Sequence, residues 1–327
     1  MNPRILVTRE VFDETLGYLA QHCEVESNQG DTAFSPEVLG QRLRNKDGVM
    51  CALTDRIDGG ILAQAPQLKV VANIAVGYNN IDVAACTARG VMATNTPGVL
   101  DDSTADLAWA LMLAAARRLT EVESYIRGGE WTGWRLKQWL GVDVHHATLG
   151  IIGMGRIGQV IARRAAGFDM RVLYHNRKRL TPSIEESLKA SYVSKETLLT
   201  EADFLVLQVP YSQETHHLIG AVELKLMKPT AVLVNSTRGG VVDDAALVEA
   251  LKSGTIRAAG LDVFENEPKL HPGFLGLKNV VLAPHVGSST EATRRGMAMT
   301  AAKNLVAGLT GGTPPNLLNP QAVKVRL

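Results

Sequence analysis

Cysteine is scarce in this chain of 327 residues, and the few cysteines form no recognisable motif. Cys23, Cys51 and Cys86 are odd in number and lack the Cys-x-x-Cys spacing of zinc sites and redox centres. The pattern therefore argues against a disulfide framework and against a bound metal. Because unpaired thiols are typical of a reducing compartment, we expect a cytoplasmic protein without a metal site.

An excess of one charge and a long hydrophobic run are also missing. Lys and Arg number 34 and Asp and Glu number 33, so the net charge of +1 creates no field that favours nucleic acid or an anionic membrane. The longest apolar stretch, residues 108–116, is under half of the roughly 20 residues that a membrane span needs. The first residues do not resemble a signal peptide. We therefore expect a small-molecule ligand, and neither nucleic acid nor a membrane as partner.

The sequence does contain short apolar runs that alternate with helical patterns, in two series. The first series is RILVT, DGVMCAL, LKVVANI and GVMATN, and the second is ATLGIIG, MRVLYHN, DFLVLQVP, AVLVNST, IRAAGLDVF and NVVLAPHV. Such alternation is typical of parallel sheets with crossover helices, and the length exceeds what one core usually supports. We therefore predict an α/β protein with two Rossmann-like, doubly wound parallel-sheet domains and a cleft between them.

The predicted domain boundary is discontinuous. Residues 103–119 form a predicted interdomain helix, residues 290–309 form another helix, and the tail GGTPPNLLNP is expected to return to the first domain. Residues 1–100 with 288–327 are the expected substrate domain, which also takes part in catalysis. Residues 101–287 are the expected dinucleotide-binding domain.

A glycine-rich turn marks the expected cofactor site. Gly153, Gly155 and Gly158 form a GxGxxG pattern between the apolar run at 149–152 and the helical pattern that follows. Glycines at a strand-to-helix turn allow a tight bend and the close approach of a pyrophosphate to the positive end of the helix. A plain tight turn is the alternative interpretation.

The segment after MRVLY bears on the choice of cofactor. NAD-specific sites carry an acidic residue about 20 positions beyond the glycines, and this chain has none there. It has instead His175, Asn176, Arg177, Lys178 and Arg179, where cations would attract a 2′-phosphate. NADP(H) is therefore the preferred cofactor and NAD(H) the alternative, although a solvated basic turn would show the same composition.

Three polar residues follow apolar runs of the second series and are the candidate catalytic groups. Arg238 follows AVLVNST, and its planar guanidinium suits a 2-oxo acid because it can bind the carboxylate at two points and polarise the carbonyl. His285 follows VVLAP and can supply the proton that a ketone takes up on reduction. Glu267 is the candidate carboxylate that stabilises the protonated imidazole.

Together, GMGRIG, NSTRGGVVDDAAL, AAGLDVFENEP and APHVGSST resemble the D-isomer-specific 2-hydroxyacid dehydrogenase family over essentially the whole chain. That resemblance implies a catalytic arginine, glutamate and histidine at Arg238, Glu267 and His285. It also implies that Asp262 contacts the nicotinamide carboxamide.

Within the family, VGYNNID, RGGEWTGW, DVHHATLGIIGMGRIG and YHNRKR are most similar to glyoxylate/hydroxypyruvate reductases and 2-ketogluconate reductases, which mostly prefer NADPH. The resemblance implies that the backbone at Val76 and Gly77 holds the substrate carboxylate, with Leu53 on the facing loop. Phosphite dehydrogenase carries a lysine where this chain has Val76, which counts against phosphite.

The segment EWTGWRLKQWL resembles a dimer-contact arm, so the resemblance implies a homodimer. An aromatic residue of such an arm can reach the neighbouring active site, and Trp134 or Trp139 is the candidate. The alternative is that these residues and Trp131 only pack an interface.

Two sets of contacts are thus expected. The substrate contacts are Leu53, Val76, Gly77, Trp134, Trp139, Arg238 and His285. The cofactor contacts are Thr104, Gly153, Gly155, Arg156, Ile157, Gly158, Asn176, Arg177, Lys178, Val209, Pro210, Thr215, Ser236, Thr237, Arg238, Asp262, His285 and Gly287. The expected activity is reduction of a small 2-oxo acid to its D-2-hydroxy acid. The alternatives are another dehydrogenase of the family, such as one for phosphite, and a cofactor-sensing binding protein.

Overall fold

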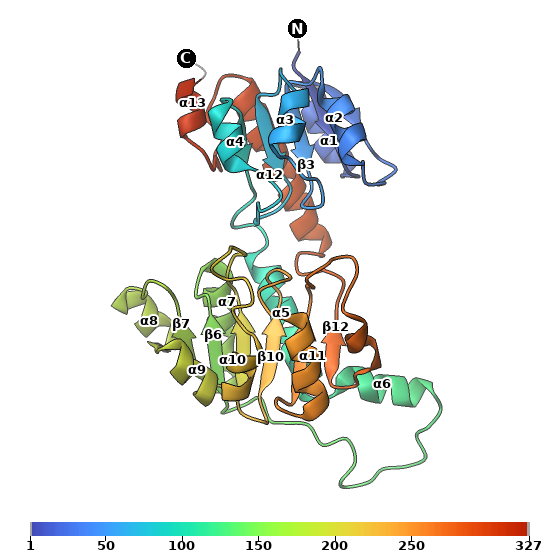
Figure 1. The fold of residues 1–327 in the computed structure, drawn as a ribbon, viewed down its shortest axis with the longest axis vertical. Helices are drawn as coiled ribbons and strands as arrows, with labels where there is room; N and C mark the ends of the chain where they lie inside the picture. The colour runs from blue at the N-terminus through green and yellow to red at the C-terminus, as the bar shows by residue number, and fades with distance from the viewer. Residues whose placement is uncertain (1, 326–327) are drawn as a thin grey trace. The chain divides into compact units, whose positions relative to one another are not determined.

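The structure, a computed structural model, describes residues 2–325 and divides the chain into two compact units. One unit is Met1–Leu100 with Ser289–Leu327, and the other is Asp101–Ser288. Each unit holds one sheet whose strands are all parallel (Figure 1). The α/β class with two parallel-sheet domains is therefore confirmed.

The sheet of the first unit has five strands in the order β2-β1-β3-β4-β5. Its strands are β1 (Arg4–Val7), β2 (Glu24–Ser27), β3 (Gly48–Cys51), β4 (Val70–Asn73) and β5 (Met92–Thr94). Its helices are α1 (Asp13–Ala20), α2 (Pro36–Leu43), α3 (Gly59–Gln64), α4 (Val83–Ala88), α12 (Glu291–Leu309) and α13 (Gln321–Val325). Because strand side chains alternate between faces, Ile5 packs with α1 and α12, whereas Leu6 packs with α2 and α3 on the opposite face.

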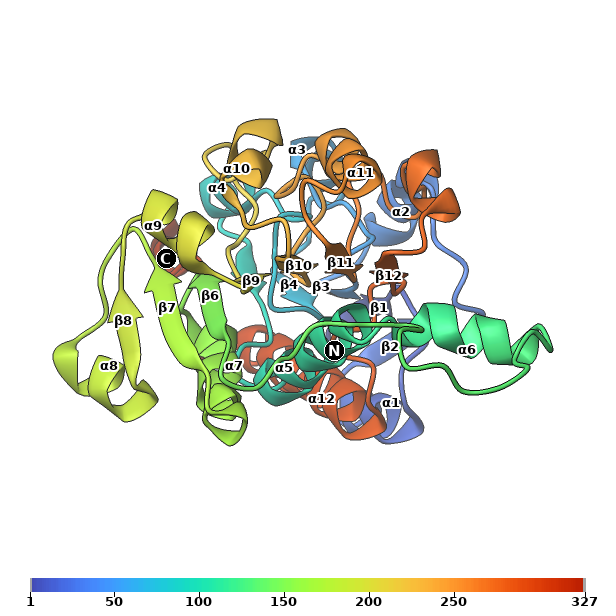
Figure 2. The same cartoon turned by 90° about the horizontal axis from the view of Figure 1, so that it is seen from below.

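The sheet of the second unit has seven strands in the order β12-β11-β10-β9-β6-β7-β8. Its strands are β6 (Thr148–Ile152), β7 (Arg171–His175), β8 (Ala190–Tyr192), β9 (Phe204–Leu207), β10 (Val232–Asn235), β11 (Ala258–Leu261) and β12 (Val280–Leu282). Its helices are α5 (Asp101–Ala116), α6 (Leu119–Arg127), α7 (Arg156–Ala165), α8 (Pro182–Leu188), α9 (Lys195–Glu201), α10 (Ala221–Leu226) and α11 (Asp244–Ser253), with 3-10 turns at Ala166–Phe168 and Pro272–Gly276. Helices α5 and α7 cover one face, and α9, α10 and α11 cover the other (Figure 2).

Two strands escape prediction from the sequence, and both lie at sheet edges. Strand β2 reads EVES and β8 reads ASY, so neither shows a run of buried apolar residues. An edge strand pairs on one side only and tolerates such polar sequences. Because β8 was not predicted, the start of α9 at Lys195 was not predicted either.

Helix α5 begins two residues earlier than predicted and ends at Ala116, three residues before the predicted end. Arg118 adopts a left-handed conformation with φ of 56°, which ends α5 and starts α6 in a new direction. Helix α5 packs on α7, β10 and β11 and therefore belongs to the second unit. The predicted helix at 290–309 is present as α12, with Thr290 as its N-cap.

The segment after α6 is largely exposed to solvent. It leaves the layered core as a long loop before the chain returns to β6 (Figure 1). Trp131 and Trp134 on this loop are 61% and 79% exposed, and Ile126 on α6 is 58% exposed. No helix within residues 2–325 is both long and apolar enough to cross a membrane.

Candidate active site

A cavity of the second unit opens where its strand order reverses. Strand β6 is followed in space by β7 on one side and by β9 on the other, and the carboxyl ends of β6 and β9 both contribute to the cavity. Its volume is about 720 Å³. In open α/β sheets, ligands bind at this kind of reversal. The cavity is therefore the candidate cofactor site.

The three glycines of the turn have different surroundings. Gly153 has φ of +100°, and a Cβ there would lie 2.4 Å from the Gln208 carbonyl oxygen. A Cβ on Gly158 would lie 2.4 Å from the Gly153 carbonyl oxygen, which allows α7 to pack closely on the turn. A Cβ on Gly155 would meet no atom within 4 Å. The middle glycine thus leaves open space beside the first turn of α7, as a bound pyrophosphate requires.

The residues of the basic turn after β7 have two roles: one fixes the turn, and others line the cavity. Arg179 forms a two-point ion pair with Glu185, at 2.8 and 2.9 Å, and the Tyr174 hydroxyl donates to the same carboxylate at 2.6 Å. The Arg179 and Tyr174 bonds hold the pKa of Glu185 at about 2. Arg179 therefore fixes the turn, while Arg177 and Lys178 line the cavity.

Asn176 holds the glycine turn itself, because its Oδ1 accepts the Met154 N–H at 2.6 Å. Arg177 Nη1 lies 3.1 Å from Glu214 Oε2, and both side chains are exposed. A pair this exposed is weak, so the guanidinium can exchange Glu214 for another anion at little cost. Polar donors rather than an acidic residue thus stand at the end of β7.

The cavity includes some predicted cofactor residues and others that sequence reasoning missed. The predicted ones are Gly153, Gly155, Asn176, Arg177, Lys178, Val209, Pro210 and Thr215. The missed ones include Lys195, Gln208 and Glu214. Lys195 begins α9 directly after the undetected strand β8, so the missing strand concealed it.

The remaining predicted cofactor residues lie outside this cavity. Arg156, Ile157 and Gly158 form the first turn of α7. Ser236 and Thr237 are buried after β10, where Gln208 Nε2 donates to Ser236 Oγ at 2.9 Å. Their role as cofactor contacts stays a prediction.

Arg238 follows β10 on a loop that is pressed against another loop of the same unit. A Cβ on Gly239 would lie 1.7 Å from the Phe264 carbonyl oxygen, so only glycine fits there. Phe264 begins the segment that carries Glu267, and its N–H donates to Glu267 Oε1 at 3.0 Å. Burial lowers the pKa of Arg238, and the nearby charge of Glu267 opposes this shift. The contact between the two loops thus brings Arg238 close enough to Glu267 for their charges to interact.

Glu267 and His285 form a direct pair. Glu267 Oε2 lies 2.8 Å from His285 Nδ1, and both side chains are partly exposed. Burial alone would raise the pKa of Glu267, but the bond and charge of His285, the Phe264 N–H and the charge of Arg238 together lower it. With Nδ1 engaged by the carboxylate, Nε2 is the ring nitrogen left for a ligand. This arrangement suits general acid–base chemistry.

Asp262 holds the loop on which His285 stands. Its two carboxylate oxygens accept the N–H groups of Val286 and Gly287 at 2.7 and 2.8 Å, and its carbonyl accepts the His285 N–H at 2.9 Å. These bonds sustain His285 in the left-handed region, with φ of 56°, which is costly for a non-glycine residue. Burial raises the pKa of Asp262 despite the bonds that it accepts. Thr104 lies beside Gly287, as a cofactor contact there would require.

A second histidine–carboxylate contact involves the same loop as Glu267, and His217 is not among the residues predicted from the sequence. His217 Nε2 contacts Glu265 Oε1. The Glu265 N–H donates to Asp244 Oδ2 at 3.1 Å, and burial chiefly raises the pKa of that carboxyl to about 6. Glu265 is two residues from Glu267, so these contacts anchor the loop that bears the catalytic candidate. Nothing in the spacing of His217 along the chain signals this contact.

Leu53, Val76 and Gly77 lie in the first unit. Leu53 follows β3 and is partly exposed, and Val76 and Gly77 follow β4. All three therefore stand at the carboxyl edge of that sheet, where ligands of open α/β sheets bind. Their role in substrate binding stays a prediction.

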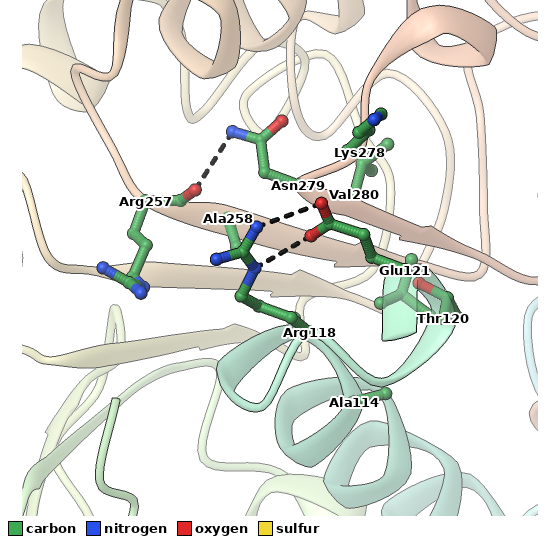
Figure 3. Close-up of a pocket in the computed structure, with 11 residues that line it drawn as sticks. Ala114, Arg118, Thr120, Glu121, Arg257, Ala258, Lys278, Asn279 and Val280 are labelled. Carbon is green, nitrogen blue, oxygen red and sulfur yellow. Dashed lines mark hydrogen bonds and ion pairs between the residues drawn. The ribbon is translucent and has the colours of Figure 1, made fainter. Parts of the chain in front are cut away.

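A second cavity, of about 380 Å³, lies at the amino-terminal ends of β11 and β12 (Figure 3). The cofactor-site cavity lies instead at the carboxyl ends of the strands. Arg118 and Glu121 form a two-point pair at the rim of the second cavity, at 2.8 and 3.0 Å, and Arg257 and Lys278 flank it. Apolar residues also line it: Ala114, Ala115, Ala258, Val280 and Val281. This cavity contains none of the predicted cofactor residues.

Comparison with known proteins agrees with this geometry. The model of the D-isomer specific 2-hydroxyacid dehydrogenase NAD binding domain matches residues 109–287. The chain is 51% identical to a glyoxylate reductase of Thermococcus gammatolerans, over 100% of this chain and 98% of the relative. It is also 51% identical to a glyoxylate reductase of Aeropyrum pernix, over 99% and 98%. Among solved structures, an NADPH-dependent glyoxylate/hydroxypyruvate reductase of Sinorhizobium meliloti in complex with NADP and malonate has a TM-score of 0.87 and 33% identity, covering 98% of each chain.

The doubly wound sheet with a glycine-rich turn at its strand reversal defines a dinucleotide-binding α/β protein. With relatives this similar over their full length, the chain belongs to the D-isomer specific 2-hydroxyacid dehydrogenase family. The resemblance noted from the sequence motifs is thereby confirmed.

Proposed function

We propose that the protein reduces a small 2-oxo acid to its D-2-hydroxy acid with a nicotinamide cofactor. The observation that carries the proposal is the 2.8 Å contact between Glu267 Oε2 and His285 Nδ1, which leaves the second ring nitrogen of His285 for a substrate oxygen. The relatives named glyoxylate reductase support glyoxylate as a substrate. Hydroxypyruvate and 2-ketogluconate are the other candidates, and the absence of a lysine at position 76 disfavours phosphite.

The residues would divide the reaction as follows. Arg238 binds the carboxylate of the acid through its planar fork and polarises the adjacent carbonyl. The nicotinamide, when bound, supplies the hydride that the carbonyl carbon accepts. His285 donates the Nε2 proton to the carbonyl oxygen, while Glu267 stabilises the imidazolium through Nδ1. One hydride on the carbon and one proton on the oxygen convert the 2-oxo group, an aldehyde in glyoxylate and a ketone in hydroxypyruvate, into a hydroxyl group.

The proposed cofactor preference is NADP(H) over NAD(H). Arg177 and Lys178 line the cavity at the end of β7, and Asn176 replaces the acidic residue that would repel a 2′-phosphate. The exposed Glu214 can release Arg177 to a phosphate. NAD(H) lacks this phosphate and loses only that interaction, so it remains a weaker cofactor.

We further propose that the protein acts as a homodimer through α6 and the loop that follows it. Trp131, Trp134 and Ile126 expose large apolar side chains there, and such a surface favours association. Trp139 packs on Tyr125 and beneath the Arg118 guanidinium of its own chain. Trp134 is therefore the better candidate for reaching a partner's active site. Sedimentation of the wild type and of Trp134→Ser tests this: a wild-type monomer would contradict it.

We also propose a role for each of the two units and a cellular location for the protein. The unit Asp101–Ser288 would bind the dinucleotide, and the other unit would bind substrate. The three cysteines are buried and free, which agrees with a cytoplasmic location.

A panel assay tests the proposed activity and cofactor together. The consumption of NADPH and of NADH is followed with glyoxylate, hydroxypyruvate, 2-ketogluconate, pyruvate and phosphite. We expect reduction of glyoxylate or hydroxypyruvate with a higher kcat/KM for NADPH. An enzyme that reduces none of the 2-oxo acids would contradict the proposed activity and would favour a cofactor-sensing role. A higher kcat/KM for NADH would contradict only the cofactor preference.

A further inference from the structure

Hydrogen bonds from buried groups hold the backbone of the loop that follows β4 in the first unit. Three successive carbonyls of this loop accept hydrogen bonds from buried groups: Ala75 from the Thr96 N–H at 3.0 Å, Val76 from Asn95 Nδ2 at 2.8 Å, and Gly77 from Asn73 Nδ2 at 2.9 Å. Asn73 and Thr96 are fully buried and Asn95 is 8% exposed. All three carbonyls are therefore held by groups of the buried interior.

The direction of these carbonyls fixes the direction of the neighbouring N–H groups. In a trans peptide, the C=O of one residue and the N–H of the next point in opposite directions. The N–H groups of Val76, Gly77 and Tyr78 therefore point away from the buried donors. Within residues 2–325, no group accepts a hydrogen bond from any of these three N–H groups. Tyr78 is 45% exposed, so the row of donors ends at the surface.

We propose that Asn73 and Asn95 are positioning residues that hold these N–H groups as a receptor for the substrate carboxylate. This inference rests on the proposed reduction of a 2-oxo acid. Neither asparagine touches the acid in this account. Each acts through the peptide group that it orients, and consecutive backbone N–H groups turned to one side bind anions well because their donors are preorganised.

Asn73 also couples this receptor to the facing loop. Its Nδ2 lies 3.2 Å from Asn80 Oδ1, and Asn80 Nδ2 lies 3.2 Å from the Ala52 carbonyl and 3.1 Å from the Asp55 carbonyl. Leu53 lies between those two carbonyls along the chain. The asparagine pair thus fixes the spacing between the receptor and the loop of Leu53. We therefore expect Asn73 to affect the size of substrate that is accepted as well as carboxylate binding.

The test compares Asn95→Ala with Asn319→Ala, a matched control in the same unit. Asn319 is also buried, at 2% exposure, and its side chain bonds the backbone of Val91 and Ala93 away from the receptor. Steady-state reduction of glyoxylate is measured together with inhibition by oxamate, an unreactive analogue of a 2-oxo acid. Asn95→Ser serves as a second variant if Asn95→Ala does not fold.

We expect Asn95→Ala to raise the KM for glyoxylate and the Ki for oxamate about tenfold, the loss typical of a disturbed hydrogen bond to a charged group. The kcat should change less than about threefold, and the KM for the cofactor should stay the same, because the receptor contacts neither the hydride nor the proton. Asn319→Ala should leave KM and Ki near wild type. Equal KM and Ki values in the two variants would overturn the assignment of Asn95 while an active wild type still supports the proposed function. A wild type that reduces no 2-oxo acid would overturn both.

Discussion

His285 Nδ1 lies 2.8 Å from Glu267 Oε2, and this contact joins the loops that follow β12 and β11. His285 reaches Glu267 from a left-handed backbone conformation that Asp262 holds in place. The carboxylate is thus positioned at one ring nitrogen while the other faces away from it. This relationship supports a proton donor whose orientation is fixed before substrate binds.

Replacing Glu267 by Gln should weaken reduction, because a neutral amide no longer stabilises the imidazolium. We expect kcat to fall about a hundredfold and the pH range of fast reduction to contract at its alkaline end. The measurement is a pH profile of kcat for glyoxylate reduction. A profile that matches the wild type in height and shape would argue against the role of Glu267.

The same variant has a predicted effect on stability. Since the folded state lowers the pKa of Glu267, its ionised form stabilises the protein above the usual carboxyl range, and this contribution is lost as pH falls through the lowered value. The Tm difference between wild type and Glu267→Gln should therefore shrink as the pH falls below about 4.5. A Tm difference that stays constant across this pH range would contradict the lowered pKa of Glu267.

Gly239→Ala tests whether the loop of Arg238 must touch the loop of Glu267. The added methyl would overlap the Phe264 carbonyl, so the two loops must separate. We expect kcat/KM to fall at least tenfold, because misplacement by about 1 Å is costly in a preorganised site. Gly167→Ala is the control, since a Cβ there meets no atom within 4 Å. An equal fall in kcat/KM in both variants would show that activity does not depend on the contact between Gly239 and Phe264.

Gly155→Ala separates cofactor binding from folding. A Cβ at Gly155 meets no protein atom, so the Tm should match the wild type. The methyl would occupy space beside the first turn of α7 where the pyrophosphate is expected, and the KM for the cofactor should rise about tenfold. A variant that keeps the wild-type KM would contradict the placement of the pyrophosphate.

Arg177→Ser tests the cofactor preference. Loss of the guanidinium should lower kcat/KM for NADPH about tenfold and leave that for NADH nearly unchanged. The control is Arg171→Ser, which removes another exposed arginine, paired with Glu201, outside the residues that line the cavity. If both cofactors lost equally in Arg177→Ser, the 2′-phosphate would not be the partner of Arg177.

Sequence reasoning succeeds here where apolar runs carry the signal. The candidates Arg238 and His285 were recognisable because each follows a buried strand, and parallel strands bring their carboxyl ends to one edge. The α/β class follows from the same alternation. The contact between Glu267 and His285, 18 residues apart, needed either the family resemblance or the fold, because no spacing rule predicts it.

The failures have equally physical causes. Strands β2 and β8 are polar edge strands, so periodicity does not reveal them. Arg177 and Arg179 look alike in the sequence, and only packing around Tyr174 shows that Arg179 is tied to Glu185. The contact between His217 and Glu265 spans 48 residues, so no spacing rule could have found it.

The role of His285 as proton donor is tested by the kcat for glyoxylate reduction by NADPH in wild type and in His285→Ala, with cofactor binding measured by fluorescence in both. We expect an active wild type and a variant whose kcat is lower by about a thousandfold while its affinity for NADPH is retained. A variant that reduces glyoxylate at the wild-type rate would contradict the assignment of His285 as the proton donor.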